Sequence, residues 1–307
     1  MNNIRQDILK ILAYFEYFNY PLSREDIYSF LPQHYPHADI DEILNLLSED
    51  KIIFRIEEFY SLQNQISHVE KRRKGNKRAL QQLEIAKKVA AILSHFPFVE
   101  SIAVSGSLSK YYADEKADID FFIITTANRL WIARTCLHIL KKLSYIAGKQ
   151  NWFCMNYFVD ETGMEIKEKN IFTAMEIVTL LSMQGTTQFK NFMGANSWTN
   201  NFFPPRANSR YSINEIKRGF ARKFFEKVFN ARLGDFTDKW LMNLTAKRWK
   251  NKARNKKLND HGARIGMMVN PHFSKPDPKN FQAKVVQRYE WRVKQLLASE
   301  EMVKIAL

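Results

Sequence analysis

The chain of 307 residues is long enough for two or three domains, and a hydrophobic content of 45% can supply their cores. Its 47 Lys and Arg exceed its 32 Asp and Glu, and a net charge of +15 favours a polyanionic partner or substrate such as RNA, DNA or acidic lipid. Two cysteines, Cys136 and Cys154, cannot form a disulfide framework, which indicates a reducing, cytoplasmic compartment. We expect no signal peptide and no membrane span, because residues 1–6 are polar and the apolar segment 130–147 contains several basic side chains.

The first 62 residues predict three helices followed by a β-hairpin. Apolar residues at helical spacing predict the first helix over residues 4–18, and Ser23 is a capping residue for the second. A third helix begins at Asp39, and residues 52–62 predict two short strands with a tight turn. This order of elements resembles the winged helix-turn-helix family.

The third helix argues against DNA binding by this winged helix-like domain. Winged helices read DNA through that helix, and phosphate contacts dominate their affinity. Residues 37–50 contain no Lys or Arg but five acids. The whole segment 1–62 holds 5 basic and 11 acidic side chains, a charge of −6. We therefore favour contact with a protein partner, or with the rest of the chain, over a transcription factor.

Residues 63–99 predict a basic linker and a helix. The segment 63–80 is polar, with four consecutive basic residues at 71–74 and a helix-breaking pair at Gly75-Asn76. Apolar periodicity predicts a helix over residues 80–96, which Pro97 ends.

Two acids close together on a predicted strand are the most specific signal in the chain. An apolar run at 101–104 leads into Gly106-Ser107, and ten residues later Asp118 and Asp120 open a second apolar run. Alternate residues of a strand share a face, so these carboxylates would lie side by side and repel each other by ~1 kcal/mol in water and ~4 kcal/mol at a surface-like dielectric. A divalent cation such as Mg²⁺ or Mn²⁺ would relieve that repulsion.

This spacing resembles the signature of the DNA polymerase beta-like nucleotidyltransferase superfamily: Gly, Gly or Ser, a gap, then Asp, apolar, Asp or Glu. The resemblance implies an α+β fold with a mixed sheet over residues 100–205. It also implies transfer of a nucleoside monophosphate from a nucleoside triphosphate to an acceptor, with Asp118 and Asp120 holding two Mg²⁺ ions. The alternative is the solvated edge of an ordinary strand.

Residues after the first strand are candidates for binding the triphosphate. Gly106 would allow close approach of the backbone, and Ser107 would add a hydroxyl. We expect a helix to begin at Ser107 or Ser109, because a helix amino terminus presents N–H groups to an anion. Lys110 would lie one turn further on, within reach of phosphate or in solvent.

The third acidic position of the superfamily is where this chain departs from the pattern. The next predicted strand, 152–159, has Asn156 in its middle. Asp160 is four positions later, so its side chain would point to the same face of the sheet, but it lies at the strand's end. Asp160 is the candidate general base, with Glu165 behind it. If Asn156 fills the position instead, the chain is a degenerate member that binds nucleotide or nucleic acid as a regulator.

The remaining segments are predicted to be structural. His138 is interpreted as a packed residue of a helix over 129–147. Residues 173–176 have capping-box spacing, which assigns Glu176 to a helix start. The stripe of Ile216, Phe220, Phe224 and Val228 is interpreted as core packing.

Residues 206–307 predict a basic helical domain with a charge of +15, from 24 basic and 9 acidic side chains. Seven basic residues in the eleven of 247–257, with Trp249 among them, suit nucleic-acid binding and a solvated helix equally. An irregular loop over 270–276 precedes a last helix over 285–297. Among relatives of this fold the acceptors include RNA ends, aminoglycoside-like small molecules and protein hydroxyls, and the sequence does not choose between them.

Overall fold

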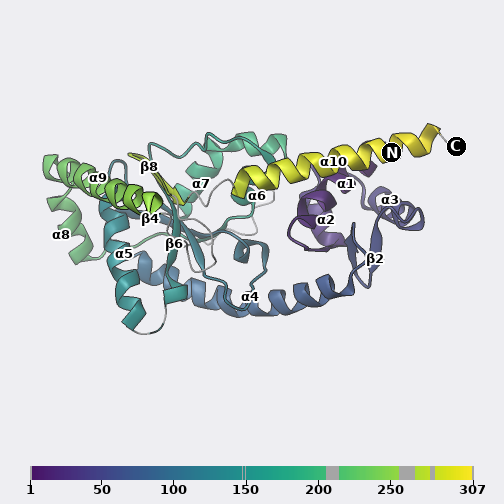
Figure 1. Ribbon diagram of the computed structural model, residues 1–307. Coiled ribbons are helices and arrows are strands. Elements are labelled where there is room, and N and C mark those ends of the chain that lie inside the picture. The colour runs from purple at the N-terminus through teal and green to yellow at the C-terminus, as the bar shows by residue number, and fades with distance from the viewer. Residues whose placement is uncertain are drawn as a thin grey trace.

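The computed structural model describes residues 2–146, 148, 150–204, 214–255, 267–276 and 281–305, and the chain has an α+β architecture. A small three-stranded sheet belongs to the N-terminal residues, and a six-stranded sheet forms the centre of the rest. In Figure 1 the N-terminal helices lie at one end of the molecule and the larger sheet at the other. The α+β class predicted from the sequence is confirmed.

The N-terminal unit, residues 2–62, contains the predicted helices and hairpin. Its helices are α1 (Asn2–Glu16), α2 (Arg24–Phe30) and α3 (His37–Glu49). Its strands are β1 (Leu22–Ser23), β2 (Phe54–Ile56) and β3 (Phe59–Ser61), which pair antiparallel in the order β1-β3-β2. Ser23 caps α2 in a reciprocal capping box with Asp26, as the sequence predicted.

The predicted linker and break before the second domain are wrong. One helix, α4 (Ile66–Leu93), runs through both segments without interruption. Gly75 lies inside α4, where the ring of Tyr112 covers it so closely that an added Cβ would come within 2.2 Å of the ring. A glycine that looks like a helix breaker therefore serves as a packing position.

Helix α4 also holds the N-terminal unit in place. The buried side chain of Arg72 donates hydrogen bonds to the backbone oxygen of Pro21 and to Asp26, the latter at 2.6 Å. Its guanidinium lies over the rings of Tyr20 and Phe59, at 4.5 and 4.3 Å from their centroids. Because the charge is paired and stacked, its burial is compensated.

The six-stranded sheet has the order β7-β4-β5-β6-β9-β8. Its strands are β4 (Val99–Val104), β5 (Asp120–Thr125), β6 (Cys154–Asp160), β7 (Leu181–Gln184), β8 (Met267–Asn270) and β9 (Phe273–Pro276). Only the β5–β6 pair is parallel among these neighbours. The irregular loop predicted over 270–276 is wrong, because β8 and β9 form a hairpin that extends the sheet from β6.

The two faces of this sheet bury different residues of β5. Ile119, Phe121 and Ile123 pack in one core with α4 and α5 (Leu130–Ile146). Phe122 and Ile124 pack in the opposite core with residues of α6 (Ile171–Val178) and α7 (Thr186–Ala195). Alternation along β5 therefore places Asp120 on the α6–α7 face. Short 3₁₀ segments, Leu108–Lys110, Gln150–Trp152 and Ser197–Asn201, connect the larger elements.

Three helices complete the C-terminal part: α8 (Phe220–Val228), α9 (Arg232–Arg254) and α10 (Phe281–Ile305). The core role predicted for the stripe on α8 is wrong, since Phe220, Phe224 and Val228 are exposed and only Ile216 packs against the core of the sheet. The basic run 247–257 continues α9 as far as Arg254, and its last two residues lie outside the described part.

Helix α10 joins the two ends of the molecule. It packs against α1 and α6, and Val285 and Leu296 belong to the same core as the N-terminal helices. Arg292 forms an ion pair with Glu16 at 2.7 Å. Figure 1 shows α10 and α4 running along opposite sides of the molecule. None of the helices in the described ranges is long and apolar enough to cross a membrane.

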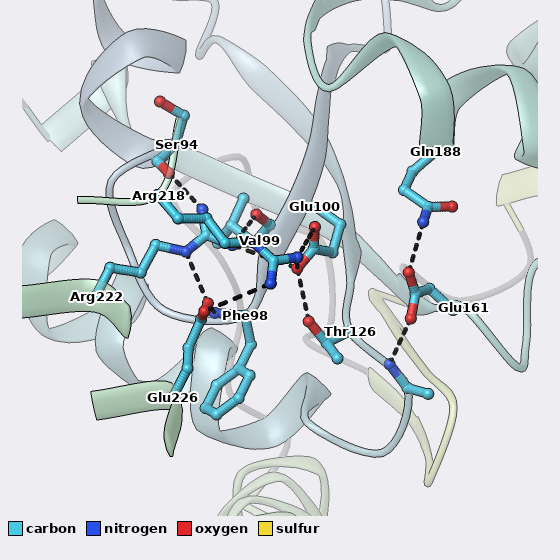
Figure 2. Close-up of polar contacts among 11 residues, drawn as sticks. Ser94, Phe98, Val99, Glu100, Thr126, Glu161, Gln188, Arg218, Arg222 and Glu226 are labelled. Carbon is cyan, nitrogen blue, oxygen red and sulfur yellow. Dashed lines mark hydrogen bonds and ion pairs between the residues drawn. The ribbon is translucent and has the colours of Figure 1, made fainter. Parts of the chain in front are cut away.

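Buried arginine also anchors α8 to the beginning of β4 (Figure 2). Arg222 donates to the backbone oxygens of Ser94 and Val99, both at 2.8 Å, and to Glu226 at 2.7 Å. Arg218 adds two hydrogen bonds to Glu100, at 2.8 and 2.9 Å. This network lies at the opposite end of β4 from the Gly106 bend, so it supports the scaffold rather than the candidate site.

Replacing Asp238 by asparagine should change how stability depends on pH. Asp238 of α9 accepts the Ile132 N–H at 2.9 Å, and burial raises its pKa to about 6 from an ordinary 3.8. The folded state therefore binds the proton more tightly than the unfolded state, and stability falls by ~3 kcal/mol as pH rises through this window. Chemical denaturation at pH 4 and pH 7 should show the variant gaining up to that amount relative to wild type. An equal difference at both pH values would contradict this assignment.

Candidate active site

A cavity of about 910 Å³ lies between the N-terminal unit and the six-stranded sheet. We call it the central cavity. One end is formed by the bend after β4, by β5 and by β6, and the other by α1 and α10, with α6 along the side. Its volume is at the upper end of the range for small-molecule and cofactor sites.

The Gly106 bend is fitted closely to Asp120. The Ser105 N–H donates to the Asp120 carbonyl at 2.9 Å, which continues the pairing of β4 with β5. Gly106 has a φ of +68°, a conformation that side chains disfavour, and an added Cβ would lie 2.8 Å from the Asp120 carboxylate. The predicted juxtaposition of Gly106-Ser107 with Asp120 is therefore present, and Gly106, Ser107 and Asp120 all line the central cavity.

Asp118 and Asp120 interact electrostatically. Burial, together with the charges of Asp118 and Glu176, raises the pKa of Asp120 to about 6, against a hydrogen bond from Cys154 and the positive charge of Lys141. Asp118 is half-buried and lies two residues before Asp120, outside β5 and outside the lining of the cavity. The Ile119 N–H donates to the Asn151 carbonyl at 3.0 Å, and the Ile119 side chain packs in the core on the opposite face of the sheet from Asp120.

The carboxylate pair fits a divalent cation only with help from a substrate. Within the described ranges no three His, Cys, Asp or Glu side chains are arranged to hold a metal ion. Mg²⁺ is commonly bound through one or two carboxylates, with phosphate oxygens and water completing its shell. Burial is the main cause of the raised pKa of Asp120, and the charges of Asp118 and Glu176 add to it, so a cation bound beside this carboxylate would lower that pKa.

The helix predicted after Gly106 is wrong. Only a three-residue 3₁₀ turn, Leu108–Lys110, follows the bend, so this segment presents no α-helix amino terminus to an anion. The exposed Ser107 lines the cavity. Lys110 lines it too, but its Nζ donates to Glu176 at 2.7 Å and to the Gly106 carbonyl at 3.1 Å.

Asn156, rather than Asp160, lies at the candidate site. The β5–β6 pairing matches Phe121 with Met155 and Phe122 with Tyr157, which leaves Asn156 as the extra residue of a bulge that lines the cavity.

Asp160 lies opposite Thr125, five residues further along β5 than Asp120, a separation of ~17 Å at strand geometry. Its buried carboxylate accepts hydrogen bonds from Asn128, Thr162 and Gly163 and contacts His272. The structure does not bring Asp160 to the cavity, and Glu165 is paired with lysines in an exposed loop.

Glu176 is a cavity residue that sequence reasoning assigned to a helix cap. The N-cap of α6 is Asn170, whose side chain accepts from Thr173 N–H at 3.0 Å, so the predicted capping box at 173–176 is wrong. Glu176 is thereby free of any capping role and lines the cavity, where its charge acts on Asp120 and on Tyr14. The sequence signal that could have identified Glu176 as a site residue is Asn170. This capping residue lies three positions before Thr173 and lets α6 begin earlier than predicted.

The charges that line the central cavity are mostly paired. Lys110 pairs with Glu176, Lys275 with Glu168 and, at 3.8 Å, Lys71 with Asp114. Asp120 is an additional acid, so the described lining is slightly acidic. A polyphosphate would therefore enter with a counter-cation rather than alone.

His138, predicted to be structural, and the two cysteines lie outside the lining of the cavity. His138 is half-buried in α5, and burial lowers its pKa to about 3, so its ring is neutral. Cys136 and Cys154 are unpaired, and burial raises the pKa of Cys154 to about 12.

Comparisons with protein-family models, with curated proteins and with solved structures found no match to this chain. Its function is therefore inferred from the residues of the site.

Replacing Gly106 by alanine should damage the site more than the fold. The left-handed backbone costs an L-residue ~1–2 kcal/mol, and the new methyl group would also displace the Asp120 carboxylate. Gly148 is a matched control, because its φ is +64° and an added Cβ meets nothing within 4 Å. Both variants should lose similar stability in denaturant titrations. Only Gly106→Ala should weaken binding of Mg²⁺–ATP in calorimetry, by ~10-fold or more if the carboxylate shifts; equal affinities in the two variants would contradict the close fit.

Proposed function

We propose that the protein is a metal-dependent nucleotidyltransferase, which transfers a nucleoside monophosphate from a nucleoside triphosphate to an acceptor hydroxyl. The observation that carries this proposal is the packing of Asp120 against the left-handed Gly106 bend, at the end of a cavity large enough for both substrates. A mixed sheet with Asp120 at the start of its second strand also agrees with the nucleotidyltransferase resemblance.

Each residue of the site has a separate role in the proposed reaction. Asp118 and Asp120 would hold Mg²⁺ or Mn²⁺, which supplies charge neutralisation and polarises phosphate oxygens when bound. Gly106 lets the backbone approach a phosphate, and the Ser107 hydroxyl donates to one of its oxygens. Asn156 offers an amide at the third position, where it can orient a substrate but cannot accept a proton.

Lys110 and Glu176 form an exchangeable pair in this proposal. A bound phosphate draws the Lys110 ammonium away from Glu176, which leaves that carboxylate without its ion-pair partner. The acceptor oxygen then forms a bond to the α-phosphorus as its proton passes to Glu176. The bond from the α-phosphorus to the bridging oxygen breaks, and its electron pair leaves with pyrophosphate.

The second candidate is a regulator that binds nucleotide without turning it over, and Asn156 is the observation that favours it. Calorimetry with Mg²⁺–ATP and a pyrophosphate-release assay with γ-labelled ATP separate the two. Binding together with pyrophosphate release supports the transferase. Binding without release, across all four nucleoside triphosphates and with acceptors of each class, supports the regulator.

The helices and three-stranded sheet of the N-terminal unit support a winged-helix fold with an intramolecular role. Its core includes residues of α6 and α10, and its acidic α3 remains a poor match for DNA. We propose nucleic-acid contact only for the basic residues of α9. A mobility shift with the full chain, compared with a variant in which Lys247, Arg248 and Lys250 are glutamine, tests that contact.

A further inference from the structure

Large apolar side chains are exposed along α8 and the first turns of α9. Phe220 and Phe236 have the largest exposed fractions of the set, 86% and 71%. We call the set the apolar stripe, and its members are Phe220, Phe224, Val228, Leu233, Phe236 and Trp240. Single exposed apolar residues are common on protein surfaces, but a concentration of large ones in one short stretch of chain marks a surface that meets an apolar partner.

Basic residues follow the edge of the apolar stripe. Within each helix the members of the stripe are three or four residues apart, so they share one face of α8 and one face of α9. At 3.6 residues per turn, an exposed basic pair lies beside each face: Lys223 and Lys227 on α8, and Arg232 and Lys239 on α9. Helices that lie in a membrane interface have this arrangement, with Phe and Trp towards the acyl chains and Lys or Arg towards the headgroups.

The other face of α8 is firmly attached to the fold. Phe225 stacks on Phe229 at 4.5 Å between ring centroids, and Glu226 accepts a hydrogen bond from the Phe98 N–H at 2.8 Å. Arg129 holds the corner between α8 and α9 by donating to the Phe229 carbonyl at 2.7 Å. The apolar stripe is therefore presented by anchored helices, and its exposure does not result from loose packing.

The exposed charge of these two helices is positive. Residues 220–254 contain ten Lys and Arg but three Asp and Glu. Glu226 pairs with Arg222 at 2.7 Å, and Asp235 pairs with Arg129 at the same distance. The third acid, Asp238, is buried. The basic side chains beside the apolar stripe therefore suit an anionic partner.

An anionic lipid surface fits this combination better than a protein or a nucleic acid does. Lysine is depleted from protein–protein interfaces, whereas it is enriched in helices that bind membranes. Nucleic-acid bases stack on aromatic rings, but Val228 and Leu233 offer no ring. The headgroup boundary of a bilayer accepts aliphatic and aromatic side chains alike. The nucleic-acid contact proposed above uses later residues of α9, from Lys247 onwards.

We propose that α8 and the first turns of α9 bind the surface of a membrane that contains anionic phospholipid. The apolar stripe enters the boundary between headgroups and acyl chains, and the basic residues at its edge contact lipid phosphates. Figure 1 shows α8 and α9 at the opposite end of the molecule from α3. Because Arg222 ties α8 to the beginning of β4, the lipid contact and the Gly106 bend lie at opposite ends of that strand. This inference does not depend on the proposed nucleotide transfer.

Flotation of the full chain with lipid vesicles tests the proposal. Vesicles of phosphatidylglycerol and phosphatidylcholine in equal parts should bind wild type ~10-fold or more tightly than phosphatidylcholine alone, at low salt. Replacing both Phe220 and Phe224 by serine should weaken binding to the anionic vesicles by ~10-fold or more, since two large apolar side chains no longer enter the bilayer. Replacing both Lys223 and Lys227 by glutamine should weaken it by ~5-fold or more, and this loss should shrink at high salt.

Leu80→Ser is the matched control. Leu80 lies on α4, outside the apolar stripe, and is 61% exposed, close to the 64% of Phe224. This variant should bind vesicles as wild type does, and all the variants should melt near the wild-type temperature, because every changed side chain is exposed.

Three results would overturn the proposal. The first is equal binding, or no binding, of wild type to the two kinds of vesicle. The second is a double serine variant that binds anionic vesicles as tightly as wild type or as Leu80→Ser. The third is a double serine variant that loses affinity for an RNA oligonucleotide while its vesicle binding is unchanged, which would assign the apolar stripe to nucleic acid.

Discussion

Replacing Asp120 by asparagine is expected to reduce nucleotide transfer by ~10³-fold or more. The substitution removes one of two carboxylates proposed to hold the divalent cation, and charge stabilisation by such an ion contributes several kcal/mol to the transition state. The fold should not suffer, because burial already raises the pKa of Asp120 to about 6 and a neutral amide avoids that cost at pH 7. Steady-state pyrophosphate release and thermal melting measure the two effects separately.

Asp114→Asn provides the comparison for Asp120. Asp114 also lines the cavity, but its carboxylate is exposed and bonds to the Tyr112 hydroxyl at 2.7 Å. We expect its transfer rate to stay within ~3-fold of wild type, as for a screened surface charge. A rate in Asp120→Asn that matches Asp114→Asn would contradict the role assigned to Asp120.

Replacing Glu176 by glutamine is expected to lower kcat by ~10²–10³-fold, within the range of a lost general base. Glutamine can still accept the hydrogen bond from Lys110, so the ion pair becomes a neutral contact and the local geometry persists. Binding of Mg²⁺–ATP should change little or become tighter, because Lys110 no longer has to leave a carboxylate. Single-turnover rates should fall by the same factor as kcat, because the lost step belongs to the chemistry and not to product release.

The control for Glu176 is another lysine-paired carboxylate of the same cavity. Glu168 pairs with Lys275 and lies towards β9, away from Asp120 in the proposed reaction. Glu168→Gln should keep kcat and the single-turnover rate. If both variants lose activity to the same degree, the loss reflects the charge of the cavity and not proton transfer by Glu176.

The part of the site that could be predicted is the part that neighbouring strands bring together. A short gap between Gly106 and Asp120 allows β4 and β5 to pair antiparallel, and that pairing alone sets Ser105 against Asp120. The amphipathic α1, α3 and α5 and the Ser23 cap were predictable for a similar reason, since periodicity and capping depend on residues a few positions apart.

The missed elements depend on residues that are distant in sequence. β9 is four residues long and is held by β6, more than a hundred positions earlier, so its own sequence carries little strand signal. Gly75 looks like a break until Tyr112 is placed over it. Tyr14 lies in α1, and its place in the lining of the cavity depends on how α1 packs against α10, which follows more than 260 positions later.

The prediction of Asp160 as the third acidic residue of the site was wrong because of a local feature, a β-bulge in β6. Parity along β6 favoured Asp160, but the bulge at Asn156 changes the register, and Asp160 lies against Thr125. Its carboxylate instead closes the turn at Thr162 and Gly163. A bulge of one residue cannot be read from alternation, because it reverses the face of every residue after it.

The most direct measurement is anomalous diffraction from crystals of the full chain soaked with Mn²⁺ and a non-hydrolysable nucleoside triphosphate. We predict a manganese peak bound by the carboxylates of Asp118 and Asp120, with the α-phosphate next to Gly106 and Ser107. A triphosphate bound elsewhere, or manganese held by other residues while Asp118 and Asp120 keep their present surroundings, would contradict the account.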